Sequence, residues 1–156
     1  MAGIRVAVEI EATPAEVWKV VEPIERHVDW MHDAVAIRFT SEQTCGVGTE
    51  FLCDTKVGPI RLVDRMEITQ WEAPAVMGVR HSGIVKGDGH FLLQAIDPVS
   101  PGGRAPHTLF VWQETLVFPW WLGGPVGAFI GGGLVLRAIW KRNLRELKRL
   151  VEHTVR

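Results

Sequence analysis

Cysteine is scarce in this sequence, and the short motifs of common catalytic and cofactor-binding sites are absent. The two cysteines, Cys45 and Cys53, form no CxxC pair and no cluster with histidine, so the sequence predicts neither a disulfide framework nor a zinc site. His27 and His32 lie on either side of Asp29, but no third metal ligand is indicated. The sequence contains no dinucleotide-binding glycine motif, P-loop, G-x-S-x-G or H-E-x-x-H, and we therefore expect no metal and no cofactor.

Net charge is also nearly absent, because seventeen basic and eighteen acidic residues almost cancel. This balance suggests no strongly charged partner, and the tryptophans are not interleaved with basic residues, so nucleic-acid binding is not expected. Residues 137–156 are an exception, with seven basic and two acidic residues. They are either the solvated face of a helix, with cations placed favourably near its C-terminus, or a patch for an anionic surface.

Long apolar runs are rare, and only residues 115–136 are uncharged over a length that could cross a bilayer. This segment contains two prolines and six glycines, which would leave backbone groups unsatisfied in lipid. A loop closing over a pocket is the favoured interpretation, and loose membrane attachment through Trp120 and Trp121 is the alternative. The first eleven residues carry three charges and no apolar core of a signal peptide, so we expect a cytoplasmic protein.

What the sequence does contain is a series of strand patterns after two short helices. Residues 3–11 alternate apolar and polar side chains, as a half-buried strand does. Thr13, Pro14 and Glu16 form a helix-start pattern, and a second short helix is expected over about 24–30. Strands are then predicted at about 34–41, 47–55, 58–71, 75–82, 87–96 and 107–118. Their short, turn-rich connections predict an antiparallel meander, and the length suits a single domain spanning 1–156.

The chain is predicted to end in one long helix, from about Pro125 to His153, which would span roughly 40 Å. Its apolar stripe comprises Leu136, Ile139, Trp140, Leu144, Leu147, Leu150 and Val151. Three consecutive glycines, 131–133, open two alternatives: the helix begins only after Gly133, or small residues make room for a ligand or for close approach to the sheet. A helix of this length after serial strands requires a curved sheet, which tends to leave a hollow between them.

The element order and several short motifs together resemble the START-like superfamily, also called SRPBCC, the group of birch-pollen allergens and polyketide cyclases/dehydrases. The motifs are ATPAEVWKVV, the DWM around Trp30, ITQWEAP at 68–74, TLFVWQETLVF and FPWWLGGPVG. The resemblance covers nearly the whole chain. It implies an α+β helix-grip fold, in which a seven-stranded antiparallel curved sheet wraps around a long C-terminal helix, with two short helices after the first strand. It also implies an apolar cavity for a lipid, polyketide or aromatic molecule, without specifying one chemistry.

Strand alternation predicts that three polar side chains face this hollow. Asp64, His81 and Glu114 each lie in phase with the apolar residues of their strands. Their apolar companions are Ile60, Leu62, Met66 and Ile68 for Asp64, Met77 and Val79 for His81, and Phe110, Trp112, Leu116 and Phe118 for Glu114. The three are either an acid/base group acting on a ligand or polar side chains satisfied at the cavity rim, and the opposite face could also be the inner one.

Binding of a hydrophobic small molecule, as a carrier or sensor, is the function that these patterns favour. The alternative is a polyketide cyclase/dehydratase-like enzyme using Asp64, His81 or Glu114 in the same cavity. Ligand contacts are expected from Trp30, Leu62, Asp64, Met66, Met77, His81, Phe110, Trp112, Glu114, Leu116, Trp121, Phe129, Gly132 and Leu136. Weak membrane-surface contact through Trp120, Trp121 and the basic helix is a further expectation, for a monomer or a homodimer.

Overall fold

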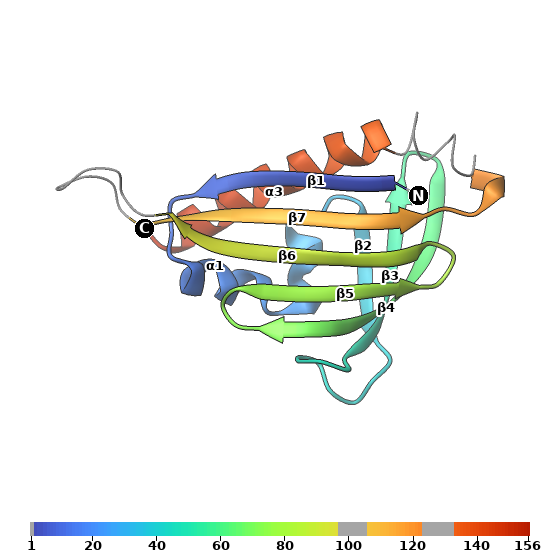
Figure 1. The fold of residues 1–156 in the computed structure, drawn as a ribbon, viewed down its shortest axis with the longest axis horizontal. Helices are drawn as coiled ribbons and strands as arrows, with labels where there is room; N and C mark the ends of the chain where they lie inside the picture. Colours follow the sequence, from blue (N-terminus) through green and yellow to red (C-terminus); the bar gives the residue numbers. More distant parts are fainter. Residues whose placement is uncertain (1, 97–105, 123–132) are drawn as a thin grey trace.

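The computed structural model describes residues 2–96, 106–122 and 133–156 of the chain (Figure 1). The strands are β1 (Ala2–Ile10), β2 (Ala34–Phe39), β3 (Glu50–Val57), β4 (Ile60–Glu72), β5 (Val76–Ser82), β6 (Lys86–Ile96) and β7 (His107–Val117). The helices are α1 (Pro14–Val21), the 3-10 helices η1 (Ile24–Asp29) and η2 (Trp120–Leu122), and α3 (Gly133–Thr154). All seven strands form one antiparallel sheet in the order β1-β7-β6-β5-β4-β3-β2. The predicted α+β helix-grip fold is therefore confirmed.

The long helix α3 lies along β1 on the same side of the sheet as α1 and η1 (Figure 1). Five residues of its predicted apolar stripe are buried, with Leu144, Leu147 and Val151 almost completely removed from solvent, and Ile139 and Leu150 are partly buried. The helix ends at Thr154, close to the predicted end. The predicted start at Pro125 falls in the range 123–132, which is outside the described residues.

The first helix begins where the sequence predicts, because its capping box forms. Thr13 Oγ1 accepts from the backbone N–H of Glu16 at 3.2 Å, and Glu16 Oε2 accepts from the backbone N–H of Thr13 at 2.8 Å. Some strand boundaries differ from prediction. The strand expected from residue 47 begins at Glu50, because Gly46 and Gly48 have positive φ and turn the chain just before it. The second predicted helix is present, and it is a 3-10 helix.

Glycines on β6 open the concave face of the sheet at its centre. Gly87 and Gly89 pair with His81 of β5 and Glu114 of β7, respectively. A Cβ atom on Gly89 would overlap the Cγ of Glu114, and one on Gly87, where φ is +141°, would overlap the carbonyl oxygen of Thr115. These positions therefore require glycine, and at these two positions β6 places no side chain between His81 of β5 and Glu114 of β7.

Candidate functional site

A cavity of about 140 Å³ lies between the concave face of the sheet and the helices. Its walls are mostly apolar and come from β2 to β7, η1 and α3. The polar residues that line it are His27, Asp33, Cys53, Thr55, Asp64, His81, His90 and Glu114. This combination of apolar walls and a few convergent polar groups is typical of small-molecule sites.

Most residues predicted to contact a ligand do line the cavity. They are Leu62, Asp64, Met66, Met77, His81, Trp112, Glu114, Leu116 and Leu136. Their strand positions follow the predicted alternation, so the inner face of β4, β5 and β7 is the one that the sequence indicates. Ile60 is the exception among the residues assigned to that face, since it is exposed at the start of β4.

Trp30, Phe110 and Trp121 require correction, because they are not among the lining residues. Trp30 and Phe110 are completely buried and pack behind the cavity wall: the rings of both contact Phe91, with centroid distances of 5.8 and 5.2 Å. Phe91 does line the cavity. Trp121 belongs to η2 and is exposed. The predicted contacts Phe129 and Gly132 lie outside the described residues.

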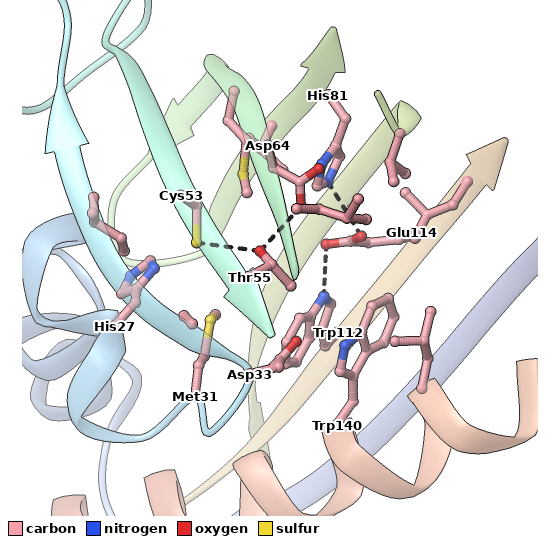
Figure 2. Close-up of a pocket in the computed structure, with 18 of the residues that line it drawn as sticks. His27, Met31, Asp33, Cys53, Thr55, Asp64, His81, Trp112, Glu114 and Trp140 are labelled. Carbon is pink, nitrogen blue, oxygen red and sulfur yellow. Dashed lines mark hydrogen bonds and ion pairs between the residues drawn. The ribbon is translucent and has the colours of Figure 1, made fainter. Parts of the chain in front are cut away.

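The three predicted polar residues form a band across the concave face (Figure 2). His81 Nε2 lies 3.3 Å from Glu114 Oε2, and the indole Nε1–H of Trp112 donates to Glu114 Oε1 at 2.9 Å. On the other side, Thr55 Oγ1 donates to Asp64 Oδ2 at 3.2 Å. Four strands thus contribute one polar cluster to an otherwise apolar cavity.

Three atoms of this cluster have no hydrogen-bond partner within the described part of the chain, and each of the two side chains is only 7% exposed. They are Asp64 Oδ1, His81 Nδ1 and His81 Nε2, of which His81 Nε2 still has the ion-pair contact with Glu114 at 3.3 Å. Buried polar atoms are nearly always paired, because an unpaired one loses its hydration without compensation. A ligand or a water molecule that reaches these atoms would supply the missing hydrogen bonds.

Burial and mutual charge set the ionisation of the cluster. Burial raises the pKa of Asp64, and the positive charge of His81 and the Thr55 hydrogen bond only partly oppose this. Burial also lowers the pKa of His81, but the carboxylates of Glu114 and Asp64 outweigh this, and the pKa lies above its usual 6.5. The histidine is therefore held in its protonated form by acidic neighbours. Burial raises the pKa of the Cys53 thiol to about 12. The thiol therefore stays protonated at neutral pH, and Cys53 lines the cavity without acting as a nucleophile.

Sequence reasoning missed a second polar group, on the helix side of the cavity. Asn143 of α3 is completely buried; its Nδ2 donates to Asp33 Oδ1 at 2.7 Å, and its Oδ1 accepts from the backbone N–H of His32 at 2.9 Å. Burial raises the pKa of Asp33, and the hydrogen bond from Asn143 opposes that rise. The sequence could have indicated Asn143, because it is the one polar residue at a buried position of the apolar stripe of α3. Asp33 lies in a loop, where no periodicity assigns a direction.

His27 also lines the cavity, but its imidazole has a structural role. Its Nε2 lies 2.7 Å from the carbonyl oxygen of Val21, and because a carbonyl only accepts, Nε2 carries the proton. Burial lowers the pKa of His27 to about 4. Among the described residues, no group of three or more His, Cys, Asp or Glu side chains is arranged to hold a metal ion.

The cavity lining suits noncovalent binding, and its His81–Glu114 pair could also exchange a proton with a ligand. The cavity offers apolar walls, a protonated imidazole held by a carboxylate, and a second carboxyl with a free oxygen. Trp112 and Trp140 stack at 4.3 Å with nearly parallel rings and form one aromatic wall. His81 and Glu114 could exchange a proton with a bound molecule, and no activated nucleophile lies beside them in the described lining.

Comparison with known proteins identifies the fold. No protein-family model and no curated protein sequence matches this chain. Among solved structures, a protein from Thermus thermophilus is similar with a TM-score of 0.72 and 13% identity, covering 97% of this chain and 98% of the other. A protein from Deinococcus radiodurans has a TM-score of 0.66 and 18% identity, covering 99% of both chains.

A third similar structure is the Zhui aromatase/cyclase from a Streptomyces species. Its TM-score is 0.68 at 16% identity, covering 99% of this chain and 95% of the other. Identities this low establish the fold and leave the chemistry open. The chain shares the predicted helix-grip fold with these structures.

Proposed function

We propose that the protein binds a hydrophobic small molecule in the cavity between the sheet and α3, as a carrier or sensor. The mostly apolar volume of about 140 Å³ between the sheet and the helices is the observation that carries this proposal. At ~24 cal/mol per Å³, an empty apolar cavity of this size costs about 3 kcal/mol, against a typical domain stability of about 5–15 kcal/mol. A cavity that lowers the stability of the fold by this much is expected to have a function, and ligand binding is the simplest one.

The size of the cavity limits the part of the ligand that is enclosed. An apolar cavity of about 150 Å³ accommodates a benzene molecule. We therefore expect one aromatic ring or a short branched chain to be enclosed, with larger ligands extending beyond it. The expected cytoplasmic location belongs to the same proposal, and no helix among the described residues is long and apolar enough to cross a bilayer.

Native mass spectrometry of the purified protein, followed by organic extraction, tests the proposal. We expect a co-purified hydrophobic compound, or binding of added apolar aromatics. Val79→Phe places a ring inside the cavity, and Val63→Phe places the same ring on the exposed outer face of the sheet. Val79→Phe should abolish binding and Val63→Phe should not. Equal binding by both variants would contradict the proposed location of the ligand.

An enzyme of the cyclase/dehydratase type is the second candidate. It is favoured by the buried His81–Glu114 pair at 3.3 Å inside an apolar cavity, and by a fold similar to that of an aromatase/cyclase. In this role, His81 would take a proton from the ligand, or give one to it, while Glu114 stabilises its charged form. Glu114→Gln should abolish turnover of a polyketide-type substrate and spare its binding. Unchanged turnover would remove Glu114 from the mechanism.

Contact with a membrane surface remains a prediction. Such contact would bring the protein to a source of hydrophobic ligand and would not involve the cavity residues. Trp120 of η2 is 83% exposed, Trp121 is 55% exposed, and basic residues such as Lys141 and Arg145 lie exposed on α3. Tryptophan favours the membrane interface, and basic residues favour anionic lipid. Cosedimentation with phosphatidylserine-containing vesicles should fall when both tryptophans are replaced by alanine.

A further inference from the structure

We propose that the polar end of the cavity binds the protonated amine of an amphipathic ligand, whose apolar part occupies the rest of the cavity. This inference rests on the proposed binding function and narrows the class of ligand. Its physical basis is a shortage of positive charge around buried carboxyl groups, together with one carboxyl oxygen that lacks a partner.

The first observation is the charge of the lining. Three carboxyl groups, those of Asp33, Asp64 and Glu114, face the cavity, and no lysine or arginine occurs among the described lining residues. His81 is the one imidazole paired with a carboxylate there. Burial raises the pKa of Asp64, as expected for a carboxyl group with insufficient positive charge nearby.

The second observation is how the carboxyl oxygens are paired. Both oxygens of Glu114 have partners, in Trp112 and His81, and Asp33 accepts from Asn143. Asp64 Oδ1 has no partner within the described residues, although the side chain is buried. Figure 2 shows the Asp64 carboxyl group directed into the cavity, toward His81 and Glu114. A ligand donor that reaches this position would pair with Asp64 Oδ1, while His81 Nδ1, which also lacks a partner among the described residues, would still need an acceptor.

A cation suits this position better than a neutral or anionic group. An anion would add negative charge beside three carboxyl groups in a poorly hydrated space. A carbonyl oxygen would leave Asp64 Oδ1 unpaired while Asp64 is ionised. An ammonium group donates to Asp64 Oδ1 and also supplies the missing charge.

A matched series of four ligands tests this inference on the purified protein at neutral pH. The series is 3-phenylpropylamine, 3-phenylpropan-1-ol, 3-phenylpropanoate and propylbenzene, which share one ring and differ in the end group. Affinity is measured by calorimetry and by the NMR shift of the Trp112 Nε1–H. We expect the amine to bind about tenfold more tightly than the alcohol, and the carboxylate to bind most weakly.

Two aspartate variants locate the effect. Asp64→Asn removes the charge inside the cavity while conserving shape, and the amine should lose its advantage while the affinity of propylbenzene is kept. Asp54→Asn removes the same charge from an exposed residue of β3 that pairs with Arg38, and the advantage should persist. An equal loss in both variants would assign the preference to overall charge and overturn the role of Asp64.

The outcomes separate this inference from the function on which it rests. If the alcohol or the carboxylate binds as tightly as the amine, the inference fails while the cavity remains a binding site. If none of the four ligands binds, propylbenzene included, the proposed binding function fails as well. The wild-type series decides the first question even if a variant does not fold.

Discussion

Glu114 on β7 and His81 on β5 pair across the strand that separates them, with 3.3 Å between Oε2 and Nε2. They meet because β6, which lies between the two strands, carries glycine at the positions facing them, Gly87 and Gly89. Side chains of alternate strands normally lie about 10 Å apart, since neighbouring strands are about 5 Å apart. The glycines thus convert a distant pair into a direct contact, and the ionisation of His81 depends on them.

Replacing Glu114 with glutamine should lower the pKa of His81. The Glu114 carboxylate is a principal cause of the raised pKa of His81, and glutamine keeps the size of the side chain without its charge. NMR titration of the His81 ring protons measures the change. Glu67→Gln serves as the control, because Glu67 lies opposite Arg80 in the sheet. A pKa of His81 that does not change in Glu114→Gln would contradict the assignment.

Replacing Gly89 with alanine should displace the Glu114 side chain and destabilise the protein by about 1–3 kcal/mol, because the new methyl group has no space. Urea unfolding measures the loss, and the pKa of His81 should fall at the same time. Gly3→Ala in β1 is the matched control, since a Cβ atom there meets nothing within 4 Å. Its stability should change by no more than about 0.5 kcal/mol. Equal losses in the two variants would exclude the steric explanation.

Replacing His27 with glutamine should reduce the acid sensitivity of folding. The unfolded imidazole titrates near 6.5 and the folded one at about 4, so between these values the unfolded chain binds a proton that the folded chain does not. The contribution of His27 is fully present above pH 6.5 and declines as pH falls to about 4, by about 3 kcal/mol. Urea unfolding of both proteins at pH 7 and pH 4.5 measures the difference. Identical pH dependence in the two proteins would argue against this origin.

Replacing Asn143 with alanine should cost about 2–4 kcal/mol, because Asp33 loses its donor and the backbone N–H of His32 loses its acceptor in a buried site. Arg142→Ala, at an exposed neighbouring position of α3, is the control and should have little effect. Denaturant unfolding compares the two variants. A small effect of Asn143→Ala would mean that water replaces the amide.

The strands and the inner face of the sheet could be predicted because both follow local patterns. Alternation with period two assigns Asp64, His81 and Glu114 to one face, and the pairing register then brings them together. Spacing by three and four residues likewise identifies the buried stripe of α3. Both patterns depend only on residues that are close together in the sequence, and so they could be recognised without a structure.

The parts of the site that could not be predicted depend on distant contacts. Alternation directs Phe110 inward but does not show that Phe110 packs against Phe91, which lines the cavity, without lining it itself. Asp33 lies in a loop and is directed by Asn143, which is 110 positions away in the sequence. The pairing of His81 with Glu114 requires the strand order, because only that order places two glycines between them.

The glycine positions of β6 also determine the form of the cavity. The hydrogen-bond ladder of β5, β6 and β7 continues through Gly87 and Gly89, so the sheet gains this space without interrupting its pairing. A side chain at Gly89 would displace Glu114, and one at Gly87 would strike the main chain of β7. Any larger residue at these two positions would therefore cost the protein either the contact between Glu114 and His81 or the pairing of β6 with β7.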